Sequence, residues 1–122
     1  MKLDKLFFII GLLTISSLVQ ASEYSHFKGE NVDNLDQAVK VFSTQNKKFS
    51  EIIKNGNVSL EEMGQIHQIT YSMENALRKI KLEVTEMEYL LENVHKASEY
   101  GGNQKVIEDG QKYLEKAQTL VP

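Results

Sequence analysis

The strongest constraint on the fold of this chain is an unbroken heptad repeat in its second half. Steps of three and four residues alternate through Met63, Ile66, Thr70, Met73, Leu77, Ile80, Val84, Met87, Leu91, Val94 and Ser98. Residues at this spacing form one stripe along an α-helix, because a heptad nearly matches two helical turns. Neither glycine nor proline occurs between Gln65 and Tyr100. The repeat therefore predicts one helix over residues 60–99, about 60 Å long.

Helix-ending and helix-starting residues divide the rest of the chain into two shorter helices, over about 34–54 and 104–120. The segments Asn55-Gly56-Asn57 and Gly101-Gly102 can adopt the left-handed conformation that ends a helix. Ser59 followed by Glu62 is a capping box for the long helix. Asp33 or Asn34 is expected to cap the first helix, and Asn103 the third.

Both short helices can be aligned antiparallel with the long one. Phe49 would face Ile66 and Phe42 would face Met73, whereas Gly110 would face Val94 and Tyr113 would face Leu91. The two short helices then share the long one and meet near its middle. The sequence thus predicts an all-α fold, a three-helix antiparallel arrangement with a long central helix.

Such an arrangement is only two helices thick, and it leaves apolar surface uncovered. The apolar residues beside the stripe include Ile69, Ala76, Leu90 and Ala97, with Ala38, Ile52, Ile107 and Leu114 on the short helices. One hypothesis is an antiparallel homodimer in which each end becomes a four-helix bundle. The alternative is a bent central helix that forms a compact monomeric bundle, which requires a kink.

The first 21 residues have the layout of a secretory signal peptide, which predicts a periplasmic protein. Lys2 and Lys5 precede an apolar run, and Val19 and Ala21 stand before a cleavage site at Ser22. The alternative is a retained N-terminal anchor; after cleavage no contact with the membrane is expected. Residues 22–32 form an N-terminal arm before the helical domain of residues 33–122. Tyr24 and Phe27 could dock this arm, or it could be an unstructured tail.

Composition narrows the possible functions of the mature chain. Without residues 1–21 it has 101 residues, 12 basic and 16 acidic side chains, and a net charge of −4. Mild acidity without a basic cluster argues against nucleic acid as a partner. The chain has no cysteine, so it cannot form a disulfide, a covalent c-type haem or a thiolate nucleophile.

Two histidines are the candidate cofactor ligands. His67 and His95 lie on one edge of the stripe, together with Glu74, Lys81 and Glu88. Such positions are usually half-exposed and polar, so the first interpretation is that both histidines simply bond a neighbour, with no cofactor or metal. The alternative is a haem b or transition-metal carrier, because a dimer axis near Lys81 would bring His67 opposite His95 of the second copy. That alignment also places Glu74 opposite Glu88.

The sequence gives no sign of an enzyme. No serine stands in a Gly-x-Ser-x-Gly elbow, and neither a glycine-rich phosphate loop nor a His-Glu-x-x-His helix occurs. We therefore expect no catalytic residues and no enzymatic activity.

The segments "YSHFKGE", "IHQITYSMENAL", "ENVHKASE" and "GQKYLEKA" resemble those of a family of small exported proteobacterial proteins of unknown function. The resemblance covers nearly the whole mature chain and implies a periplasmic helical protein without a known activity. The chain is also similar in size and class to soluble periplasmic b-type cytochromes. Those bind haem through a methionine in the first helix and a histidine in the last, and neither residue occurs in 34–54 or 104–120. The leading hypothesis is a non-enzymatic module that binds itself and an unidentified protein.

Overall fold

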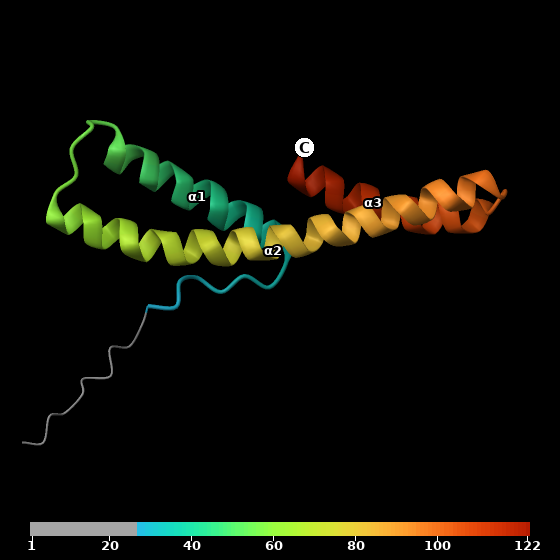
Figure 1. Cartoon of the computed structure of the whole chain (residues 1–122), viewed down its shortest axis with the longest axis horizontal. Helices are drawn as coiled ribbons and strands as arrows, with labels where there is room; N and C mark the ends of the chain where they lie inside the picture. Colours follow the sequence, from blue (N-terminus) through green and yellow to red (C-terminus); the bar gives the residue numbers. More distant parts are fainter. Residues whose placement is uncertain (1–26) are drawn as a thin grey trace, which may run out of the picture.

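The computed structural model describes residues 27–122, and within them it consists of three α-helices joined by short turns (Figure 1). They are α1 (Leu35–Ile53), α2 (Leu60–Glu99) and α3 (Asn103–Leu120). These bounds agree with the predicted helices to within one residue, so the all-α prediction is confirmed. The proposed signal peptide and Tyr24 lie outside the described residues.

The helices begin and end at the capping residues and glycines that the sequence indicates, with one exception. Asn34 caps α1 by accepting a hydrogen bond from the Gln37 amide, and Ser59 and Glu62 form the capping box of α2. Gly56 and Gly101 adopt left-handed φ angles of 70° and 72°. Asn103 was expected to cap α3 but is instead its first residue; Gly102 holds the cap position, without a side-chain bond. The helix starts one residue early because the Gly102 carbonyl already accepts from the Val106 amide.

Helix α2 is a single rod of 40 residues, and both short helices lie against it (Figure 1). Helix α1 packs on its first half and α3 on its second half, both antiparallel to it. The start of α1 and the end of α3 meet beside the middle of α2, near Glu83. The bent central helix considered as an alternative is therefore wrong, since α2 contains no break.

The face of α2 that packs in the monomer is displaced from the predicted stripe. Its most buried positions include Ala76, Glu83 and Leu90, spaced seven residues apart. One residue further along an α-helix is a rotation of 100°. The neighbouring positions Leu77, Val84 and Leu91 therefore turn away from α1 and α3, and they stay 36–48% exposed.

None of the helices within residues 27–122 is both long and apolar enough to cross a membrane.

Candidate interaction surface

Residues 27–32 of the N-terminal arm dock onto the first half of the molecule, as one of the two interpretations predicted for the arm. The Phe27 ring lies 6.2 Å from the ring of Tyr71 on α2. The Glu30 amide donates to Ser72 Oγ at 2.9 Å, and Asn75 Nδ2 donates to the carbonyls of Lys28 and Glu30. Backbone groups that would otherwise face water are thus satisfied by α2 side chains.

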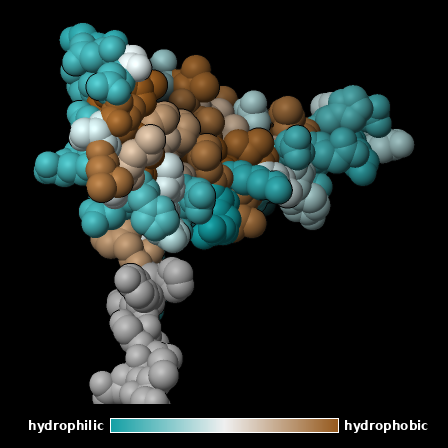
Figure 2. Space-filling model, turned by 60° about the vertical axis from the view of Figure 1, so that its left-hand side comes forward, coloured by the Kyte–Doolittle hydropathy of each residue, from teal (hydrophilic) through white to brown (hydrophobic). Residues whose placement is uncertain are grey.

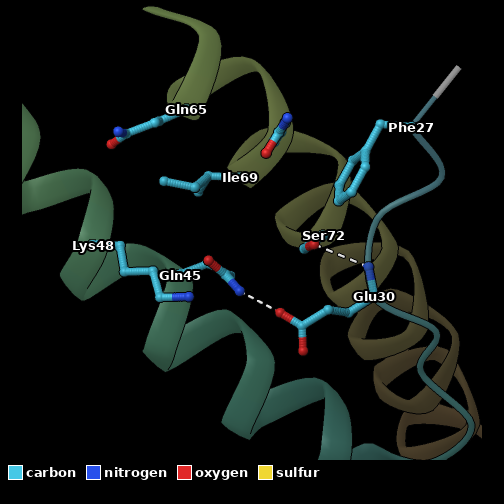
Figure 3. Close-up of a pocket in the computed structure, with 8 residues that line it drawn as sticks. Phe27, Glu30, Gln45, Lys48, Gln65, Ile69 and Ser72 are labelled. Atoms are coloured by element: carbon cyan, nitrogen blue, oxygen red, sulfur yellow. Dashed lines mark hydrogen bonds between the residues drawn. The ribbon is translucent and has the colours of Figure 1, made fainter. Parts of the chain in front are cut away.

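Glu30 also ties the arm to α1. The buried Gln45 amide donates to its carboxylate across a small pocket that Phe27 and Ser72 help to line (Figure 3). The arm therefore acts as a third layer over the first half of α2. Sequence reasoning missed this link, because neither glutamate nor glutamine has a pattern that marks a partner fifteen residues away.

Gly29 makes the close approach of the arm possible. Its φ angle is +72°, and a Cβ atom at this position would stand 2.7 Å from the Ser72 nitrogen and the Tyr71 carbonyl carbon. Real Cβ atoms do not come that close to backbone atoms, and L-residues rarely adopt this φ. The arm can lie flat on α2 only because residue 29 is glycine.

The second half of the molecule has no such third layer within residues 27–122. There α2 and α3 enclose an open groove of about 450 Å³, lined almost entirely by apolar groups. Leu91 and Val94 line it from α2, while Val106, Ile107, Gly110, Gln111, Tyr113 and Leu114 line it from α3. A Cβ atom on Gly110 would lie 3.9 Å from Val94, so the predicted facing of these two residues is confirmed.

Exposed apolar residues at heptad spacing lie on all three helices and continue the apolar surface of this groove. On α2 the line is Met63, Leu77, Val84 and Leu91, and on α3 it is Ile107 and Leu114, followed by Val121 just beyond the helix end. On α1 the line ends in the exposed Ile53 and includes the half-exposed Val39. Figure 2 shows hydrophobic residues gathered in the middle of the visible face, with hydrophilic residues around them. We call Met63, Leu77, Val84, Leu91, Ile107 and Leu114 the open face.

A charged cluster, which sequence reasoning missed, joins α2 and α3 at the middle of α2. The buried Glu83 carboxylate lies 2.8 Å from Lys79 Nζ and also contacts Lys116 Nζ of α3. Lys116 Nζ lies 3.0 Å from Glu86 as well. Hydrogen bonds from Lys116 and then Lys79 lower the pKa of Glu83, and the same contact raises the pKa of Lys116. The one available signal was a glutamate among the inward-facing positions of a heptad.

Asp109 plays a similar part nearer the end of α3. It is buried, and Lys105 Nζ lies 2.7 Å from its carboxylate. The hydrogen bond from Lys105 lowers its pKa. Both buried carboxylates within the described helices are therefore held in their charged form by lysines, as structural ion pairs require.

The two candidate ligands are not brought together within one chain. The ring of His67 packs edge-on against Tyr71, with centroids 5.1 Å apart, and His95 lies 3.4 Å from Glu99. The histidines are 28 residues apart on one unbroken helix, a separation of about 42 Å. Among residues 27–122, no three His, Asp or Glu side chains are grouped closely enough to hold a metal ion.

Comparisons with known proteins identify the family and nothing beyond it. No curated protein and no solved structure matches the chain. The model of a family of unknown function, DUF6746, matches residues 1–122. Because the match covers the entire chain, the protein belongs to the DUF6746 family of unknown function.

Proposed function

We propose that this protein is an exported, non-enzymatic binding module that recognises amphipathic helices through its open face. The observation that carries the proposal is the heptad spacing of exposed apolar residues on α2 and at the end of the chain. In coiled coils such a line packs into the side chains of a facing helix. Beside Leu91, a groove of about 450 Å³ offers a recess for side chains of the facing helix.

Three further features support this function. The described part of the arm contacts α2 at Tyr71, Ser72 and Asn75, away from the groove beside Leu91. The buried carboxylates already have lysine partners, so they serve the scaffold. The signal-peptide pattern of residues 1–21 supports a periplasmic location.

Photo-crosslinking in the native cell tests the proposal. A benzophenone amino acid replaces Leu91 or Leu114 on the open face, or Glu92 as a control. Glu92 is also exposed on α2, but it lies outside the open face and pairs with Lys96. Illumination of intact cells should give discrete adducts from residues 91 and 114 but not from 92. Adducts that are absent from all three positions, or equal at all three, would refute the binding function.

A further inference from the structure

Three charged side chains along the margin of the open face have no ion pair within the described residues. Glu74, Lys81 and Glu88 are exposed and follow one another at seven-residue spacing on α2. Their neighbours behave differently: Lys79 and Glu86 pair within the central cluster, and Glu92 pairs with Lys96. Charges beside an apolar heptad line commonly select the partner helix and its orientation. These three charges therefore restrict which helix can bind to the open face, and in which orientation.

When a second copy lies antiparallel, these charged residues can face residues of opposite charge on that copy. About a two-fold axis that crosses α2 between Leu77 and Arg78, Glu74 comes opposite the partner's Lys81. His67 comes opposite the partner's Glu88. Because the contact is symmetric, each of these pairs occurs twice.

The apolar lines of α2 match in the same alignment. In antiparallel coiled coils one heptad line packs against the other line of the facing helix. Leu77 then packs beside the partner's Ile80, and Val84 beside the partner's Met73, each two residues from the position that lies directly opposite. The half-buried line through Ile80 and Met73 is the one that α1 and α3 leave partly uncovered.

Other alignments of the same two helices are worse. A shift by one heptad, which puts the axis near Lys81, sets Glu74 against the partner's Glu88 and Lys81 against its own copy. A shift by two heptads restores opposite charges but leaves residues 60–69, about three turns, without a facing helix. Among these three alignments, the axis between Leu77 and Arg78 alone combines complementary charge with contact along most of α2, since residues 60–95 of the two copies then face one another.

We infer that the occupant of the open face is a second copy of this chain, antiparallel and in this alignment. The inference rests on the proposed function, since it names the partner of the same surface. Each end of the dimer becomes a four-helix bundle made of α1 and α2 of one chain and α2 and α3 of the other. The groove beside Leu91 then lies against α1 of the second copy, where the partner's Ile53 is exposed. His67 and the partner's His95 stay apart, so the dimer has no bis-histidine site.

Sedimentation equilibrium on the mature protein tests the charge pairing. E74K and K81E each turn two attractive contacts into two repulsive ones, so each should raise the dimer Kd roughly tenfold. The double variant E74K/K81E restores both pairs with reversed sign and should return the Kd to the wild-type value. E92K, outside the open face, should leave it unchanged. Circular dichroism of each variant verifies that the helices are intact.

Cross-linking measures the alignment directly, because the chain has no natural cysteine. E74C chains mixed with K81C chains should form a covalent dimer with a short bis-maleimide, whereas neither variant should do so alone. Cross-linking of K81C alone would overturn the inference in favour of the axis near Lys81. A monomer at all concentrations, or a double charge swap that fails to restore dimerisation, would also overturn it. If the protein is monomeric and residue 91 still cross-links to another protein in the cell, the binding function stands without the dimer.

Discussion

At the scale of single residues, the docking of the arm depends on Gly29. G29A adds a methyl group 2.7 Å from α2 backbone atoms at a left-handed φ angle. We expect the arm to detach and the free energy of unfolding to fall by about 1–3 kcal/mol. Thermal denaturation measures the loss, and NMR of the Phe27 and Tyr71 rings reports the detachment.

Gly56 provides the matched control for this substitution. It has nearly the same φ angle, +70°, but nothing lies within 4 Å of its added Cβ. G56A should therefore cost only the backbone strain of about 1 kcal/mol. If the two variants lose equal stability and Phe27 stays packed in both, the arm does not depend on close approach at Gly29.

At the scale of the helices, the central ion cluster fastens α3 to α2. E83Q keeps the shape of the side chain but leaves the ammonium groups of Lys79 and Lys116 without their shared carboxylate. The expected loss of unfolding free energy is about 1–3 kcal/mol, because the group is buried. E92Q breaks an exposed pair on the same helix and should cost much less, because water and salt screen that pair. Chemical denaturation of both variants tests whether the burial of Glu83 causes the difference between their losses of stability.

The same cluster predicts how stability depends on pH. The pKa of Glu83 is lower in the folded chain than in the unfolded chain, chiefly through Lys116. Its contribution is therefore present above the unfolded pKa of about 4.3 and is lost as pH falls through the lower folded pKa. The raised pKa of Lys116 works in the opposite sense, with a contribution lost only above about pH 10.4. Melting temperatures should be level near neutral pH and fall below about pH 4, less steeply in E83Q.

At the scale of the whole molecule, the open face links stability to concentration. If folding is coupled to dimerisation, raising the protein concentration a hundredfold should raise the melting temperature by mass action. V84E places a charge at the centre of the open face and should remove this dependence while the helices remain. Calorimetry of both proteins at two concentrations makes the comparison. A melting temperature of the wild type that is independent of concentration would contradict self-association.

The three helices and their antiparallel order could be predicted from the sequence alone. Local signals were enough for this, because capping at Ser59, left-handed glycines and heptad spacing act within a few residues of one another. The facing of Gly110 and Val94 also followed from spacing alone. A heptad pattern, however, shows only that a helix has a broad apolar side. It does not show which part of that side packs against the neighbouring helices.

Which part of that apolar side is buried depends on how the helices pack against one another. Helices α1 and α3 pack on the line through Ala76 and Leu90, so the line through Leu77 and Leu91 becomes the open face. Glu30 and Gln45, and likewise Glu83 and Lys116, come together across long stretches of sequence. Their partners depend on how whole helices rotate and meet, because a charged side chain carries no periodic signal for a distant counterpart. The positions of the ion pairs and of the open surface are therefore properties of the packed molecule.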